Sequence, residues 1–425
     1  MTGTDNTNPG NFANRPKEEV QEIASKGGKS SHSGGFASMD PDKQREIASE
    51  GGKASSGSFE PGSEKAKEAG RKARIPSGHS TLPRYFKQHI MSRNICITAV
   101  DGNTGFLIAE LILKHRDFSR KVNSVVGLTL NPESEKAQEL KSLGAKIVPH
   151  KPGRLRVMAK TLQDTGCDTI CLVPPTHEHK LEISEELVHA AKKADVPNVL
   201  LISSAGCDYA ERSKQPRLRE FIDLETLVME AKGDPNVSTG TSPCIIRAGF
   251  YAENLLLYAK QAKEEGTLPL PIGEFHKFAP VALGDVAQVA AHVLTGKGKH
   301  GFDDRHRGQM MVVTGKMITK ILGPMLCAGK ELAEAASKAL GTELQFENIS
   351  HAEAKRVLKS QSELDPSEQQ YLLEYYSLVK EGKTNYISTT AFHDVTGEHP
   401  TEPENFFKIY ESEMRPKKKA KHEHK

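Results

Sequence analysis

Four consecutive residues, Gly102 to Gly105 (Gly-Asn-Thr-Gly), have the types and spacing that can hold a phosphate group. An apolar run over 95–100 precedes them and an apolar helical pattern over 106–113 follows, which places them in a turn between a buried strand and a helix. Glycine lets the backbone approach a ligand closely, and the first turn of a helix offers unpaired N–H groups to an anion. The sequence therefore predicts that Gly102, Asn103, Thr104 and Gly105 bind the pyrophosphate of a dinucleotide.

The elements that would position this turn alternate between strand and helix patterns. Strands are predicted at Ile95–Val100, Ser124–Thr129, Ala145–Val148, Thr169–Val173, Asn198–Ser203 and Cys244–Arg247, and helices at Glu133–Leu143, Arg154–Asp164, Glu178–Lys193 and Leu218–Ala231. This alternation of strands and helices predicts an α/β fold with a doubly wound parallel sheet over residues 93–249.

Beyond Phe250 the pattern becomes irregular and rich in helices. Helices are predicted at Tyr251–Glu265, Asp285–Leu294, Lys330–Leu340 and Glu368–Lys380, with one strand at Leu344–Ile349. We expect residues 250–412 to form a smaller subdomain that caps the carboxyl ends of the strands, where open α/β sheets bind their ligands.

The first 88 residues have a different composition, rich in Gly, Ser, Lys and Glu, and they repeat. Residues 11–30 are echoed by 35–54 and, in degraded form, by 58–73, with Phe12, Phe36 and Phe59 at matching places. The burial of so few apolar residues cannot offset the conformational entropy that is lost on folding. We therefore expect residues 1–88 to be disordered. The repeat resembles the KGG-repeat stress-induced proteins, including the fungal conidiation-specific type, which implies a hydrophilic, stress-associated segment.

The overall composition restricts the function classes. The formal net charge of +3 over 425 residues argues against a general nucleic-acid binder. No apolar run approaches the ~20 residues of a membrane span, and no secretory signal begins the chain. Six cysteines in mostly apolar segments suit reduced thiols in a cytoplasmic or nuclear protein. Cys167 and Cys171 lack a second pair, and His177 and His179 lie in a charged run, so no metal site is predicted.

Residues 93–412 resemble the NmrA-like family, atypical short-chain-dehydrogenase relatives that include transcriptional co-regulators. The resemblance rests on the glycine turn, on segments 131–140, 143–148, 172–175 and 201–206, and above all on 246–255 (Ile-Arg-Ala-Gly-Phe-Tyr-Ala-Glu-Asn-Leu). It implies a Rossmann-like fold in which Pro174 and Thr176 lie near the nicotinamide ribose. Lys316–Gly323 departs from the family pattern as an insertion.

The departures from catalytic relatives concern the proton donor. A short-chain dehydrogenase uses a Tyr and a Lys four residues later, but here Tyr209 is followed at that spacing by Ser213. Ser203 and Tyr209 are the remaining candidates, and neither has the usual partners. We expect Arg247 to anchor a strand end rather than a substrate.

The cofactor pattern also departs from the family. Leu130 stands where the family has an Arg for a 2′-phosphate, and Pro149-His150 stands where an Asp near the adenine is expected. Loss of a charge-assisted contact to phosphate removes a strong interaction. We therefore expect NAD or NADP to bind weakly or vestigially, without a preference for NADP.

Two functions remain open. The first is a non-catalytic regulator or redox sensor that binds a dinucleotide weakly and acts in transcription control through a protein partner, in the cytoplasm, the nucleus or both. The alternative is an NAD(P)H-dependent reductase of quinones or related carbonyl compounds. Neither involves a membrane, and direct contact with nucleic acid would be confined to the basic tail, residues 413–425.

The first testable prediction concerns this tail. Lys417, Lys418 and Lys419 follow Pro416 in a compact basic cluster, which is typical of a nuclear import signal or, alternatively, of a solubilising tail. If it directs import, replacing these three lysines with Ala moves a fluorescently tagged protein out of the nucleus without changing its melting temperature. A full-length protein that stays cytoplasmic in both rich and stress conditions would contradict the import function.

Overall fold

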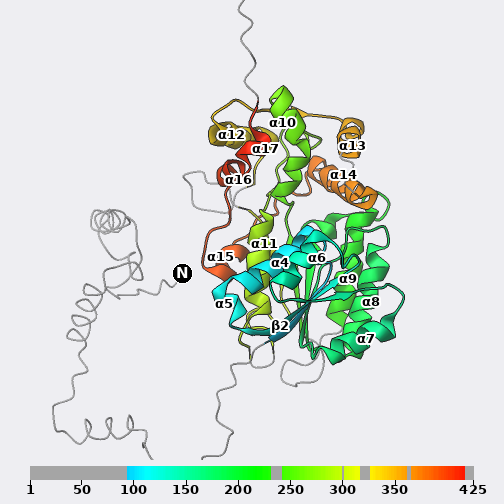
Figure 1. Cartoon of the computed structure of the whole chain (residues 1–425). Coiled ribbons are helices and arrows are strands. Elements are labelled where there is room, and N and C mark those ends of the chain that lie inside the picture. Colours follow the sequence, from blue (N-terminus) through cyan, green and yellow to red (C-terminus); the bar gives the residue numbers. More distant parts are fainter. Residues whose placement is uncertain (1–92, 231–241, 299–300, 316–325, 361–364, 417–425) are drawn as a thin grey trace, which may run out of the picture. The chain divides into compact units, whose positions relative to one another are not determined.

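The computed structural model describes residues 93–230, 242–298, 301–315, 326–360 and 365–416. Three predictions lie outside these residues: the disorder of residues 1–88, the insertion at Lys316–Gly323, and the basic tail after Pro416. The described residues form the α/β unit shown in colour in Figure 1.

A seven-stranded parallel sheet with the order β3-β2-β1-β4-β5-β6-β8 is the centre of this unit. Its strands are β1 (Arg93–Ile97), β2 (Val122–Thr129), β3 (Lys146–Pro149), β4 (Thr169–Leu172), β5 (Asn198–Ser204), β6 (Ser242–Ala248) and β8 (Met310–Val313). The predicted doubly wound parallel sheet is therefore confirmed. Every strand pair in the sheet runs parallel, so the carboxyl ends of all the strands meet at one edge.

Helices cover both faces of the sheet, as the alternation of strand and helix requires. Helices α7 (Leu155–Asp164), α8 (Lys180–Lys193) and α9 (Pro216–Glu230) cover one face, and α4 (Asn103–Lys114), α5 (Arg116–Ser119), α6 (Glu135–Ser142), α11 (Leu283–Leu294) and α15 (Ala391–Thr396) lie on the other (Figure 1). Alternate residues of β1 point to opposite faces: Ile95 and Ile97 pack with α4 and α11, while Cys96 packs with α7 and α8.

The C-terminal residues build a separate apolar core beyond the carboxyl edge of the sheet. It contains η4 (Ala252–Tyr258), α10 (Ala259–Glu265), α12 (Gly329–Leu340), α13 (His351–Lys359), α14 (Pro366–Lys380), α16 (Pro403–Ile409), α17 (Glu411–Met414), and a small parallel sheet of β7 (Thr267–Leu270) and β9 (Gln345–Asn348). The chain also returns to the main sheet after residue 250, because α11 packs on α4 and β8 pairs with β6.

Several predicted boundaries need correction. The first strand ends at Ile97 rather than Val100, because the Thr98 hydroxyl pairs with the backbone of Val173 and Ala99 turns into the left-handed region at φ 50°. The helix predicted over Tyr251–Glu265 is a 3-10 helix followed by a short α-helix. Strands β7 and β8 had no prediction.

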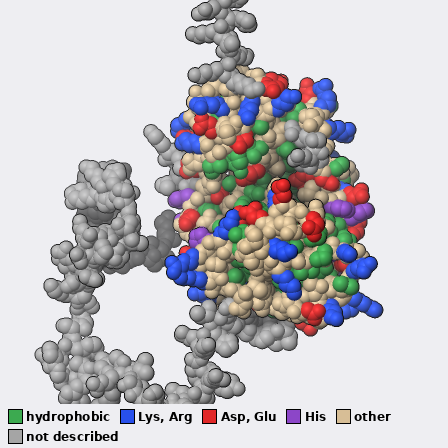
Figure 2. Space-filling model, viewed as in Figure 1, with side chains coloured by type: hydrophobic (Ala, Val, Ile, Leu, Met, Phe, Trp, Pro, Cys, Tyr) green, Lys and Arg blue, Asp and Glu red, His purple; other side chains and the backbone are tan. Residues whose placement is uncertain are grey.

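The cysteines are free thiols, and the charges on the surface are mixed. All six cysteines are free, and five of them are buried. Basic and acidic side chains are interspersed over the face seen in Figure 2 rather than separated into one basic surface. Among the described residues, no helix combines the length and the apolar character needed to cross a bilayer.

The glycine turn generates the second prediction. A Cβ at Gly105 would stand 2.5 Å from the Ala99 carbonyl oxygen and 2.6 Å from that of Thr98, and both contacts are with backbone that cannot swing aside. We expect Gly105→Ala to lower the free energy of unfolding by roughly 1–3 kcal/mol, the usual cost of overpacking.

Chemical denaturation of the variant measures this effect, with Gly284→Ala as the control. Gly284 lies in the first turn of α11 with open space around its Cβ position, so Ala is tolerated or mildly stabilising there. Equal stability of Gly105→Ala and the parent protein would show that the turn relaxes without cost.

Candidate functional site

The glycine turn joins β1 to α4 and leaves the start of the helix open. The N-cap residue Gly102 has no side-chain cap, and the first intrahelical bond is that from Phe106 N–H to the Gly102 carbonyl. The N–H groups of Asn103 to Gly105 are therefore the donors that a helix N-terminus offers to an anion. Since Gly105 also brings this turn against the carboxyl edge of β1, these residues fit the pyrophosphate of a dinucleotide.

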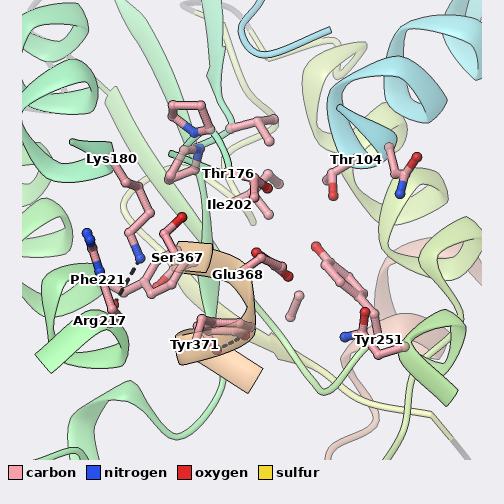
Figure 3. A pocket seen from close by; sticks show the side chains of 18 of the residues that line it. Thr104, Thr176, Lys180, Ile202, Arg217, Phe221, Tyr251, Ser367, Glu368 and Tyr371 are labelled. Carbon is pink, nitrogen blue, oxygen red and sulfur yellow. Dashed lines mark hydrogen bonds between the residues drawn. The ribbon is translucent and has the colours of Figure 1, made fainter. Parts of the chain in front are cut away.

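A pocket of about 170 Å³ lies beside this helix start, at the carboxyl ends of the strands. Four of the predicted cofactor residues line it: Asn103 and Thr104 from α4, and Pro174 and Thr176 from the segment after β4. Gly102 and Gly105 do not line the pocket; they shape the turn behind it. Figure 3 shows Thr104 and Tyr251 on one side and Lys180, Arg217 and Phe221 on the other.

The two proton-donor candidates lie in different surroundings. Ser203 lines the pocket, but its hydroxyl donates to a carboxylate oxygen of Glu225 at 2.5 Å. Glu225 in turn pairs with Arg247 through two bonds of 2.7 and 2.8 Å, which agrees with the expectation that Arg247 anchors a strand end. Tyr209 is half exposed, is absent from the pocket lining, and receives a bond from Lys383 at its backbone oxygen.

A buried lysine at the start of α8 forms one wall of the pocket. The ammonium of Lys180 lies 3.2 Å from Glu220, donates to the Arg217 carbonyl at 2.9 Å, and lies 4.1 Å from the centre of the Phe221 ring. Burial lowers the pKa of Lys180, and the Glu220 carboxylate opposes that shift. A buried lysine with a lowered pKa in a cleft is a typical feature of a functional site.

The neighbouring part of the lining comes from α14, which begins with Pro366 at its first position and an Asp365 side chain that caps the Ser367 N–H at 2.7 Å. This start directs Ser367, Glu368 and Tyr371 into the pocket. Burial raises the pKa of the Glu368 carboxyl and of the Tyr371 phenol. The Tyr371 hydroxyl lies 2.9 Å from the Ser204 hydroxyl at the end of β5.

Tyr251, directly after β6, completes the lining next to α4. Burial raises the pKa of its phenol, and a hydrogen bond with Thr104 opposes the rise. Both Tyr251 and Tyr371 therefore stay protonated at neutral pH. In the described part of the chain, no group of three or more His, Cys, Asp or Glu side chains could hold a metal ion.

The end of β2, where a dinucleotide's adenosine ribose lies in such folds, carries no cation at Leu130. Asn131 follows Leu130, and its backbone N–H donates to the Asp101 carboxylate at 3.1 Å. The nearest cation on α6, Lys136, donates to the Asn103 side chain at 2.6 Å. This side of the turn thus carries the Asp101 carboxylate and an uncharged Leu130, while Lys136 is bound to Asn103.

Sequence reasoning missed Lys180, Tyr251, Glu368 and Tyr371. Lys180 stands in a charged run that is typical of a solvated helix face. Its burial beside Phe221 arises only in the folded chain. Tyr251 belongs to the segment 246–255 that carries the strongest family match, which was a signal for its role. Nothing in the sequence around Tyr371 connects it with Ser204, which is 167 residues away.

Comparisons with known proteins gave matches for both parts of the chain. The N-terminal region matches the stress-induced bacterial acidophilic repeat motif at residues 11–32 and 35–56. It is also 89% identical over 64 residues to conidiation-specific protein 10 of Neurospora crassa, across 15% of this chain and 74% of that protein. An NAD(P)H azoreductase of Xenophilus azovorans is 26% identical over 259 residues, across 61% of this chain and 79% of the relative.

Solved structures share the fold. An NADPH-dependent quinone oxidoreductase of Escherichia coli superposes with a TM-score of 0.59 at 22% identity, covering 74% of this chain and 99% of its own. A triphenylmethane reductase of Citrobacter sp. gives a TM-score of 0.58 at 16% identity, covering 75% and 99%. The model of the NmrA-like family matches residues 91–406, which is most of the chain, and the protein belongs to that family.

Proposed function

We propose that this protein binds a reduced nicotinamide dinucleotide at the glycine turn and uses it to reduce a carbonyl compound of the quinone type. The observation that carries the proposal is the pocket itself, which has the uncapped start of α4 and Tyr251 on one side, the buried Lys180 on the other, and Tyr371 in the same lining. When bound, the cofactor would supply a hydride. The chain would orient the acceptor between its aromatic walls and provide the proton.

The alternative, a non-catalytic regulator that acts through a protein partner, was the first expectation from the sequence. It rested on the missing Tyr and Lys pair after the fifth strand and on the basic C-terminal tail. The pocket contains Tyr371 and Lys180 from other elements, so the missing pair no longer argues against catalysis. The names of relatives, among them an azoreductase and a quinone oxidoreductase, also favour a reductase.

The lining is mixed and suits a flat acceptor that carries polar atoms. Phe221, Ile202 and Leu283 contribute apolar surface, and polar side chains such as Lys180 and Ser204 share the lining with them. Polar groups that converge on a cavity fix the orientation of a small molecule, while its apolar surface packs on the rest of the wall. A quinone has this character, with one oxygen to be protonated at each end of a planar ring.

Turnover with purified full-length protein tests the proposal. We expect oxidation of NADH or NADPH in the presence of a panel of quinones and aldehydes, well above the rate in buffer. Gly105→Val should abolish both cofactor binding and turnover, while Gly284→Ala should leave both unchanged. Cofactor binding without turnover on any acceptor would return the protein to the regulator or sensor class, and no binding of any dinucleotide would refute the site.

The cofactor itself generates a further prediction. Because Leu130 supplies no cation and Asp101 adds a negative charge beside Asn131, NADP(H) gains nothing from its 2′-phosphate here. In calorimetric titrations we expect Leu130→Arg to tighten NADPH binding at least ~10-fold, about 1.4 kcal/mol, and to leave NADH binding unchanged. Asp101→Asn should act in the same direction, since an amide oxygen can still accept the Asn131 N–H.

Val157→Arg is the matched control, because it adds the same charge at an exposed position on α7. A parent protein that already binds NADPH ten times more tightly than NADH would contradict the prediction. It would also imply that a cation from another element reaches the ribose.

A further inference from the structure

The hydroxyls of Tyr371 and Ser204 form a pair in the lining of the pocket. Their oxygens are 2.9 Å apart, and both side chains line the cavity, Ser204 from the carboxyl end of β5 and Tyr371 from α14. Either hydroxyl can donate to the other. When Ser204 donates, the Tyr371 proton is free to point at a ligand in the pocket.

A cation lies beside this pair. The Lys180 ammonium is 5.8 Å from the centre of the Tyr371 ring and 4.1 Å from that of Phe221, and its side chain is only 10% exposed. A positive charge in such a poorly solvated place favours negative charge on a neighbouring phenol more strongly than it would in water. Ser, Tyr and Lys thus meet in one pocket, although they come from β5, α14 and α8.

The protonation states suit a proton donor. Burial and the Glu368 carboxyl raise the pKa of Tyr371, while the Ser204 hydrogen bond lowers it, so the phenol holds its proton before reaction. Burial also raises the pKa of Glu368, which reduces the negative charge one helical turn away on the same face of α14. Tyr209, the tyrosine that the sequence pattern selects, has none of these neighbours.

We propose that Tyr371 is the catalytic proton donor of this protein, with Ser204 and Lys180 as the residues that position and charge-stabilise it. This inference rests on the proposed reductase function. When bound, the reduced nicotinamide dinucleotide would supply a hydride to the carbonyl carbon or conjugated ring position of the acceptor and would itself be left oxidised. The π electrons move onto the acceptor oxygen, which takes the proton from Tyr371. The phenolate is then reprotonated from water through the Ser204 hydroxyl.

Matched Tyr→Phe variants test the assignment. We expect Tyr371→Phe to lower kcat/KM at least ~100-fold, the usual loss when a general acid is removed, with NADH affinity and melting temperature retained. Tyr209→Phe should keep the parent rate, because Tyr209 does not line the pocket. A Tyr371→Phe variant within threefold of the parent rate would overturn the inference while leaving the reductase function intact.

A binding measurement tests the donor without any turnover. A nitrophenol presents an oxygen anion like the one formed on the reduced acceptor, and its anion absorbs visible light. We expect the parent protein to bind the nitrophenolate at least ~10-fold more tightly than Tyr371→Phe does, with Tyr209→Phe equal to the parent. Equal affinity of the parent protein and Tyr371→Phe, or binding to neither, would overturn the proposal even if no acceptor is ever found.

The two positioning residues need conservative variants. Ser204→Ala should reduce nitrophenolate affinity and kcat by roughly tenfold with KM for the cofactor unchanged. Lys180→Met should have a similar effect, and Lys180→Arg, which keeps the cation, should restore most of it. If Met and Arg at position 180 weaken nitrophenolate binding equally, Lys180 acts through packing on Phe221 and its charge has no part in the site.

Discussion

The close approach of the start of α4 to the end of β1 is the contact on which the rest of the molecule depends. It exists only because Gly105 has no side chain, since the backbone oxygens of Thr98 and Ala99 occupy the place of a Cβ. This contact puts α4 at the carboxyl edge of the sheet, and α11 packs along α4 on the same face. Through Asp285, which binds Thr401 with both oxygens, α11 then holds the C-terminal segment. The small size of Gly105 therefore supports, through α4 and α11, the position of the segment around Thr401.

Charge pairing accounts for the shape of the pocket on its other side. Lys180 with Glu220, and Arg247 with Glu225, are little-exposed ion pairs that hold α8, α9 and β6 together beneath the cavity. Breaking such a pair leaves one charge poorly solvated and unpaired, which costs more than the pair itself contributes. These pairs fix the positions of Phe221 and Ser203, and the cavity walls consequently rest on interactions that tolerate little change.

The sequence predicted the framework well and the chemistry only in part. The runs 95–100 and 198–203 identified strands because burial on both faces leaves a nearly continuous hydrophobic signal. The glycine turn could be predicted from local spacing, while Pro174 and Thr176 came from the family resemblance. Lys180 and Tyr371 could not be predicted, since their role arises from contacts between elements far apart in the chain. The turn itself contains one feature that the sequence did not predict: Ala99 adopts a left-handed conformation at φ 50°, which residues with a side chain rarely adopt.

The origin of Tyr371 in α14 has a consequence for how the protein is made. The ribosome adds roughly 5–20 residues per second, so Ser204 emerges about ten to thirty seconds before the partner that lies 167 residues later. During that interval the parallel sheet can assemble around its glycine turn, but the wall that faces Phe221 has not yet been synthesised. Until α14 is made, the Phe221 side of the pocket has no cover in the nascent chain. The contact between Ser204 and Tyr371 therefore forms late, and it joins residues that are far apart in the sequence.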